Sequence, residues 1–122
     1  MLAFWMGQSM LELQLPFPPS ANRYWRHARG RTFLSKEARE YRLTVAALVH
    51  VEPVQGQLEV RIDYYPSDKR RWDLDNRIKQ LLDALQHAGV YCDDRQIYDL
   101  HAVRHEGHKG GRCRVRIRNM ST

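Results

Sequence analysis

Hydrophobic and polar residues alternate along three stretches of the chain, a pattern typical of strands with one buried face. Every second residue of 11–15 (LELQL) is leucine, and a proline ends the stretch. Residues 58–64 (LEVRIDY) and 112–119 (RCRVRIRN) alternate in the same way. Residues 96–105 (QIYDLHAVRH) also favour a strand, and the turn residues 106–111 (EGHKGG) would join it to the last strand as a hairpin.

Two further stretches carry apolar residues three and four positions apart, the spacing of amphipathic helices. The first follows Ser35, a favourable N-cap, and its apolar face holds Ala38, Tyr41, Val45, Leu48 and Val49. The second begins near Leu74 and stops at Gly89, with Ile78, Leu81, Leu82 and Leu85 facing inward. Residues 16–31 (PFPPSANRYWRHARGR) have the prolines and glycine of a loop, and are rich in arginine and aromatic residues.

The predicted order is strand, helix, strand, helix and hairpin. This order favours an α/β fold of the α+β type, in which a mixed β-sheet of about four strands packs against two helices. The 122 residues suit a single compact domain with a modest core, and no linker or repeat divides them. We assign this domain to residues 10–122. Residues 1–9 (MLAFWMGQS) form an N-terminal extension without a periodic partner, so a chain starting at Met10 is expected to fold.

Composition narrows the possible partners. The formal net charge is +6, which favours a polyanionic partner such as nucleic acid over a basic surface that serves solubility alone. Two cysteines without a C-x-x-C argue against a disulfide scaffold and suit a reducing cytosol. The apolar run at the start is too short to span a membrane and lacks the features of a signal peptide. We therefore expect a cytoplasmic protein without a membrane partner or a small-molecule cofactor.

The last predicted strand concentrates positive charge on one face. Alternation places Arg112, Arg114, Arg116 and Arg118 together, opposite Cys113, Val115 and Ile117. Four like charges repel unless something anionic lies over them, and Asp99, one possible cross-strand partner, cannot offset four arginines. We therefore favour contact with a polyanion over a solvated face paired with acidic residues.

The segment 70–76 (RRWDLDN) sets two carboxylates beside a concentration of positive charge. If the segment is extended, Asp73 and Asp75 leave the chain on the same side and repel each other unless a cation lies between them. A hard divalent ion, Mg²⁺ above all, accepts such oxygens and can activate water at a phosphodiester. The alternative is that either aspartate simply caps the following helix.

Other charged residues support the first interpretation. A helical projection puts Asp75, Lys79 and Asp83 at the edge of the apolar face, although ion pairs four residues apart would give the same pattern. The segment CDDR adds Asp93 and Asp94. The helix carries the chain about 20 Å away, and residues 89–94 can return about as far, so a third carboxylate can rejoin the first two without being forced to.

These residues resemble the RusA-like Holliday junction resolvases, a family commonly carried by prophages. The resemblance covers nearly the whole chain from Met10 onward. It rests on LPFPPSANRYWRHARGRTFLS, RRWDLDNRIKQLLDAL and AGVYCDD, which occur in the family's order and spacing. The combination of D-x-D-N-x-x-K, D-A-L and a late Asp-Asp is specific. Trp72 departs from the family's basic run, and it could stack on a base or pack inward.

The resemblance implies a crossover junction endodeoxyribonuclease that depends on Mg²⁺, with Mn²⁺ as a substitute, and acts as a homodimer on four-way DNA junctions. It implies metal ligation by Asp73, Asp75 and Asp94, and charge stabilisation by Lys79 in the transition state. Implied DNA contacts are Ser20, Ala21, Asn22, Arg23, Lys69, Arg70, Arg71, Trp72 and Asn76. The arginines 112, 114, 116 and 118 join this set through the charge argument above.

Three other interpretations stay open at this point. The chain could be a non-catalytic basic module that binds nucleic acid, or a less selective nuclease of branched DNA. A zinc site could form from Cys92, His101, His105, His108 and Cys113, but their spacing matches no familiar zinc finger. In place of binding zinc, His105 and His108 would flank a hairpin turn, where they could approach phosphate.

Overall fold

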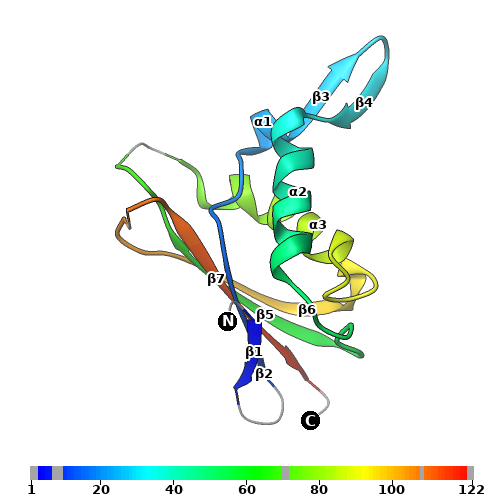
Figure 1. Ribbon diagram of the computed structural model, residues 1–122, viewed down its shortest axis with the longest axis vertical. Coiled ribbons are helices and arrows are strands. Elements are labelled where there is room, and N and C mark those ends of the chain that lie inside the picture. Colours follow the sequence, from blue (N-terminus) through cyan, green and yellow to red (C-terminus); the bar gives the residue numbers. More distant parts are fainter. Residues whose placement is uncertain (1–2, 7–9, 70–71, 108, 121–122) are drawn as a thin grey trace.

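The computed structural model describes the chain except for residues 1–2, 7–9, 70–71, 108 and 121–122 (Figure 1). Its main sheet has five strands in the order β1 (Ala3–Met6), β2 (Met10–Leu15), β7 (Arg112–Asn119), β5 (Leu58–Tyr65) and β6 (Ile97–Arg104). Neighbouring strands are antiparallel except β5 and β6, which are parallel. The predicted mixed sheet is therefore confirmed.

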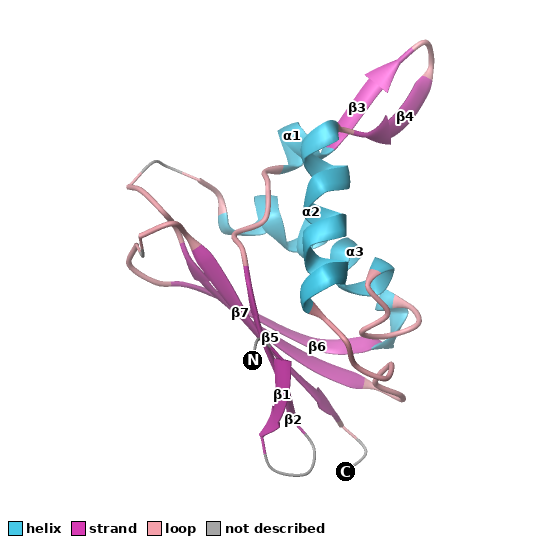
Figure 2. Ribbon diagram, in the orientation of Figure 1, coloured by secondary structure: helices cyan, strands magenta, loops and turns pink. Residues whose placement is uncertain are grey.

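Both long helices lie on the same side of this sheet (Figure 2). They are α2 (Lys36–Leu48) and α3 (Ile78–His87). The shorter elements are the helix α1 (Ala21–Tyr24), the 3₁₀ turns η1 (Leu74–Arg77) and η2 (Asp94–Gln96), and a ribbon of β3 (Trp25–Ala28) and β4 (Arg31–Leu34). No helix in the described part of the chain is both long and apolar enough to cross a membrane.

The core lies between the sheet and the two helices, as the alternation predicts. Leu11, Leu13 and Leu15 of β2 are buried, and so is every second residue of β5 and β7. Ser35 caps α2, because its hydroxyl oxygen accepts a hydrogen bond of 3.1 Å from the backbone N–H of Ala38. The apolar face of the sheet, predicted from alternation, therefore packs against the apolar faces of the helices, predicted from the spacing of three and four residues.

The predicted C-terminal hairpin is wrong. β7 does not pair with β6 but lies between β2 and β5, with hydrogen bonds to both. β6 instead forms the edge of the sheet, parallel to β5. The burial explains the choice: β7 has a fully buried apolar face suited to a central strand, whereas Tyr98 and Leu100 of β6 are 66% and 40% exposed.

Two other stretches are more ordered than their sequences indicate. The predicted loop 16–31 contains α1 and most of the β3–β4 ribbon. Residues 3–6 form β1, which pairs with β2, so the expectation that this stretch has no partner is wrong. These elements have only four residues each, too few to show a periodic pattern in the sequence, and they form because neighbouring segments pair with or pack on them. The domain boundary at Met10 stays a prediction.

Candidate active site

The backbone around Asp73 decides how its carboxylate is used. Asp73 is extended (φ −84°, ψ 133°) and stands at the N-cap of η1, but its side chain makes no capping hydrogen bond. The capping explanation therefore fails for Asp73, and its exposed carboxylate is available for other partners. Asp75 lies in η1, so the extended run assumed from the sequence stops at Asp73.

The two aspartates nevertheless line the same hollow. A depression of about 550 Å³ is lined by Trp72, Asp73, Leu74, Asp75, Ile78 and Arg104. Because the two aspartates open into the same space, a single cation there could be bound by both. Arg104 adds positive charge to this hollow. It is the last residue of β6, which is parallel to β5.

A second hollow of about 710 Å³ borders Asp73. Its lining brings together two segments that the sequence separates: Ser20 and Arg23 from the α1 region, and Trp72, Asp73 and Asn76 from the η1 region. Phe17, Glu37, Asp68 and Arg77 complete its polar and aromatic walls, with prolines beside them. The predicted DNA-contact residues of both segments therefore surround the first candidate metal ligand.

Not every predicted contact residue can be placed here. Arg70 and Arg71 lie outside the described residues, as do the side chains of Ala21 and Asn22. Lys69 is exposed and lines a third depression of about 690 Å³, together with Arg104 and Lys109. Basic residues of this region thus border three hollows, each of which Trp72 also lines.

Trp72 packs against the protein. Its ring meets those of Phe17 and Tyr64 edge to face, with centroids 5.4 Å and 5.5 Å apart. The guanidinium of Arg77 lies over Phe17 at 4.8 Å and over Trp72 at 5.7 Å. Arg104 also lies over Trp72, at 5.4 Å. Of the two possibilities left by the sequence, inward packing of Trp72 is therefore the one that the structure shows.

Two arginines of this cluster were missed from the sequence. Arg104 Nη1 donates a 3.0 Å hydrogen bond to the backbone carbonyl oxygen of Trp72, and Arg77 donates to the carbonyl oxygen of Pro18. Burial lowers the pKa of the Arg77 guanidinium. No local motif marks either residue, because the position of Arg104 depends on the parallel pairing of β5 with β6.

Lys79 and Asp94 are not part of these hollows. Lys79 is exposed on the first turn of α3. The backbone N–H of Asp94 is hydrogen-bonded to Gln86 Oε1 near the end of α3, at 2.9 Å. Asp94 lies just before the first residue of β6. Arg104, the last residue of β6, lies at the opposite end with its hydrogen-bonded partner Trp72. A strand of eight residues is about 23 Å long, so Asp94 and Trp72 are separated by roughly that length. Within one chain, the third aspartate does not rejoin the first two.

Asp83, which the helical projection placed near Asp75 and Lys79, has another function. Its carboxylate accepts two hydrogen bonds of 2.8 Å from the Arg42 guanidinium and one from the Tyr24 hydroxyl. Burial raises the pKa of Tyr24, and the hydrogen bond to Asp83 raises it further. These contacts join α1, α2 and α3, so Asp83 fixes the helix that carries Arg23 rather than belonging to a surface ladder on α3.

Three of the four arginines of β7 have acidic partners on the neighbouring strand, and the fourth, Arg112, lies over the ring of Tyr65. Arg116 and Arg114 approach Asp63 at 2.9 Å and 3.5 Å, and Arg118 approaches Glu59 at 3.0 Å. The sequence argument considered Asp99, which instead pairs with His101 at 3.0 Å. The premise of four uncompensated charges is therefore wrong, since the cross-strand acids come from β5. DNA contact by Arg112, Arg114, Arg116 and Arg118 stays a prediction.

Asp63 is the centre of this network. Only 2% of its side chain is exposed, and His105 Nε2 lies 2.7 Å from its Oδ1. Burial raises the pKa of Asp63, but the hydrogen bonds from His105 and Arg116 outweigh it and hold the pKa below its ordinary value. His105 also stacks on Tyr65, with centroids 4.6 Å apart. His105 also lines the third depression with Lys69 and Lys109, so its approach to a phosphate stays a prediction.

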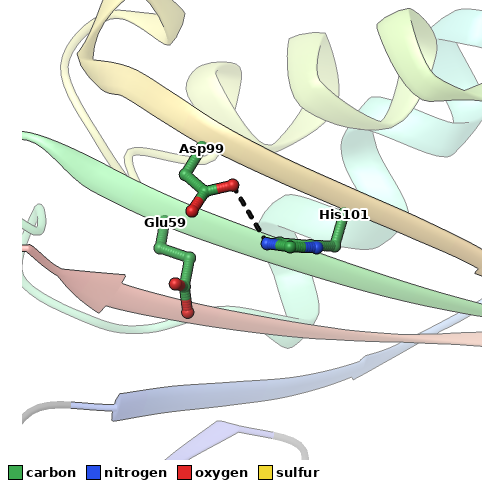
Figure 3. A group of neighbouring side chains, drawn as sticks. All are labelled: Glu59, Asp99 and His101. Atoms are coloured by element: carbon green, nitrogen blue, oxygen red, sulfur yellow. Dashed lines mark ion pairs between the residues drawn. The ribbon is translucent and has the colours of Figure 1, made fainter.

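The described residues also contain one cluster of three potential metal-ligating side chains. Glu59, Asp99 and His101 offer ligand atoms within 4.8 Å of one another, on the face of the sheet away from the helices (Figure 3). Arg118 already hydrogen-bonds the Glu59 carboxylate, and an imidazole is a poor ligand for Mg²⁺. This group is therefore a weaker site for Mg²⁺ than the exposed pair of Asp73 and Asp75.

The proposed zinc set does not come together in the described residues. Cys113 is buried in the core, and burial raises its thiol pKa to about 12. A protonated thiol does not ligate zinc, and Cys92 is exposed beside η2. His108 lies outside the described residues.

Exposed paired carboxylates in hollows that arginines also line, on a mixed α+β scaffold, are features that suit a metal-dependent nuclease. Residues 16–118 match the family model "Endodeoxyribonuclease RusA". The chain is 42% identical over 112 residues to the crossover junction endodeoxyribonuclease RusA of Escherichia coli K12, covering 88% of this chain and 93% of that protein. The relative from Enterobacteria phage 82 gives the same figures, and that of Shigella sonnei is 41% identical over the same length and shares. The chain belongs to the RusA endodeoxyribonuclease family.

Proposed function

We propose that the protein is a Mg²⁺-dependent endodeoxyribonuclease that resolves four-way DNA junctions by paired nicks, with Mn²⁺ able to replace Mg²⁺. The observation that carries this proposal is the exposed Asp73 carboxylate, which makes no capping bond and shares a hollow with Asp75. Its relatives are named for crossover junction cleavage. The surrounding basic residues supply the charge that a DNA strand needs in order to approach two carboxylates.

Asp73 and Asp75 would hold the metal ion, because exposed carboxylate oxygens are the ligands that Mg²⁺ prefers. When bound, the ion would polarise the scissile phosphate and lower the pKa of an attacking water molecule. Arg23 and Ser20 would position the phosphate backbone from one side of Asp73, and Arg104 from the other. Lys79, one turn further along, would offset charge that gathers on the phosphate oxygens. In-line attack would leave a 5′-phosphate and a 3′-hydroxyl.

The separation of Asp94 supports a homodimer in which each chain completes the site of the other. β6 has β5 as its neighbour on one side and no described strand on the other, and it exposes Tyr98 and Leu100. A two-fold axis that pairs this edge with its copy makes the two β6 strands antiparallel. The start of one β6 then lies beside the end of the other, which brings Asp94 near the partner's Asp73 and Asp75.

Such a dimer also suits the substrate. A four-way junction has approximate two-fold symmetry, and its resolution needs two cuts in strands of like polarity. Two composite sites related by the two-fold axis of the dimer would cut two strands at a fixed distance from each other. A monomer that lacks a third carboxylate would bind the ion more weakly, which would couple cutting to assembly.

Cleavage of a labelled four-way junction beside a linear duplex of the same arm sequence tests the proposal. We expect cutting of the junction that requires Mg²⁺ or Mn²⁺ and is lost with Asp73→Asn, while Glu52→Gln, an exposed carboxylate in another loop, cuts normally. Binding without cleavage at any metal concentration would indicate a non-catalytic module. Equal cutting of junctions, flaps and duplex would indicate a less selective nuclease.

A further inference from the structure

The β3–β4 ribbon stands apart from the rest of the molecule. It projects beyond α1 and α2, away from the main sheet (Figure 1). It starts at Trp25, two residues after Arg23, which lines the hollow beside Asp73. Backbone and side-chain bonds close its base: Ser35 N–H donates to Tyr24 O at 2.9 Å, and Arg39 Nη1 donates to Leu34 O at 2.9 Å. The ribbon is thus anchored to the site but has no core of its own.

The two faces of the ribbon differ in chemistry. Cross-strand pairing places Trp25 with Leu34 and His27 with Thr32 on one face. At the base of that face Trp25 packs edge to face on the buried Tyr24 at 5.1 Å, whereas His27 and Thr32 are exposed. The other face carries Arg26 directly opposite Phe33, and Ala28 opposite Arg31. Arg26 and Arg31 are exposed, and Phe33 is 47% exposed.

Its charge is of one sign. Residues 23–34 include four arginines and no acidic residue. Arg29 and Gly30 form the tip, both with positive φ (51° and 73°), which is the geometry of a two-residue hairpin turn. Glycine accepts this geometry readily, whereas arginine does so at a cost, and asparagine would be favoured there. The turn itself does not favour arginine at this position, whereas contact with a negatively charged partner would.

We propose that the face formed by Arg26, Arg31 and Phe33 enters the open centre of the four-way junction, where Phe33 stacks on a base pair at the point of strand exchange. This inference rests on the proposed function. In continuous duplex each base face is covered by its neighbour, so an aromatic ring finds a free base face only where stacking is interrupted. The arginines beside Phe33 would hold the phosphates of the crossing strands.

The ribbon would therefore recognise the branch point, separately from the aspartates that cut. A two-stranded ribbon without a core is marginally stable in water, so a partner that covers the face of Arg26, Arg31 and Phe33 would stabilise it. The aromatic contact supplies preference for branched DNA, and the arginines supply affinity for any DNA. These two contributions can be separated by substitution.

The test measures binding in EDTA, so that DNA stays intact, with a four-way junction and a linear duplex that carry 2-aminopurine at the branch point or at its equivalent position. We expect Phe33→Ala to weaken junction binding about tenfold, to leave duplex binding within twofold, and to remove most of the fluorescence change at the branch point. Phe33→Trp should restore both. Leu43→Ala, which removes a side chain of 67% exposure from α2, is the matched control and should bind as wild type.

A second variant tests the charge independently. Arg26→Gln/Arg31→Gln should weaken binding to junction and duplex alike, and reduce the slope of log affinity against log salt by about two. Equal losses for both DNAs with Phe33→Ala, an unchanged fluorescence response, or an unchanged salt slope in the arginine variant would overturn the inference. Wild-type cleavage of the junction is scored separately, so failure of the proposed function would be seen as absence of metal-dependent cutting rather than as a change in the ribbon variants.

Discussion

The guanidinium of Arg104 donates a 3.0 Å hydrogen bond to the backbone carbonyl oxygen of Trp72, the residue immediately before Asp73. This bond ties the end of β6 to the loop that presents the first candidate metal ligand. The same guanidinium lies over the indole ring at 5.4 Å, so the loop is held by a hydrogen bond and by stacking together. The position of Asp73 therefore depends on a residue 31 positions later in the sequence.

Arg104→Met should slow cleavage at least tenfold while leaving the fold intact, because displacement of a metal ligand by a fraction of an ångström is costly in a positioned reaction. Single-turnover cleavage of a four-way junction at saturating Mg²⁺ measures the effect. Arg61→Gln removes an exposed arginine from β5 and serves as the control for lost charge. Equal rates for the two variants would show that Arg104 contributes general charge only.

Mixed dimers test whether Asp94 acts across the subunit contact. Asp73→Asn and Asp94→Asn should each abolish cutting alone. If the sites are composite, a dimer of one chain of each kind has one site with both defects and one intact site, and should nick the junction at about half the wild-type rate. If each site is built within one chain, both sites of the mixed dimer are defective. Co-expression with two affinity tags isolates the mixed dimer, and absence of nicking would reject the composite site.

Asp83→Ala should lower the free energy of unfolding by about 2–3 kcal/mol, since Arg42 and the buried Tyr24 both lose their partner. The melting temperature should fall by about 5–10 °C, measured by calorimetry. Glu40→Gln is the matched control. It removes an ion pair with Lys36 whose side chains are 63% and 80% exposed, and should change stability by less than about 0.5 kcal/mol. Similar losses in the two variants would contradict the bracing function of Asp83.

Asp63 predicts a pH dependence. Its pKa is lower in the folded protein than the ordinary value of about 3.9, so its ionised form stabilises the fold above that pH. This contribution is lost as pH falls through the folded-state pKa. Asp63→Asn should therefore melt below wild type at pH 7, and the gap should narrow below about pH 4. Glu52→Gln should show no such narrowing, and a constant gap for Asp63→Asn would mean that its effect is purely steric.

The sequence was most informative where one period persisted over several residues. The alternation of residues 11–15, 58–64 and 112–119, and the stripe that follows Ser35, identified four main elements and most of the core. The partner of each strand could not be predicted in this way. Alternation determines which face of β7 is buried, but its position between β2 and β5 depends on competition among all strands for a central place.

The candidate site shows the same division. Asp73 and Asp75 stand together in the sequence, so local reasoning finds them. Arg104 reaches them only through the parallel pairing of β5 and β6. Similarly, Glu59 and Asp63 pair with three of the four arginines of β7 because they occupy the adjacent strand, a pairing that the sequence did not predict. The net charge of a strand face can be judged only when the residues on the neighbouring strands are known.

The central position of β7 also bears on how the protein is made. Ribosomes release the chain from its amino end, so β2 and β5 leave the exit tunnel well before the strand that joins them. Until the last eight-residue strand emerges, each has an unpaired edge towards the missing neighbour, and the two halves of the sheet are unconnected. A truncated product that ends before Arg112 would contain every candidate metal ligand and the whole basic ribbon, yet lack the strand on which the scaffold closes. Incomplete translation would then yield an unstable fragment and not a partly active nuclease.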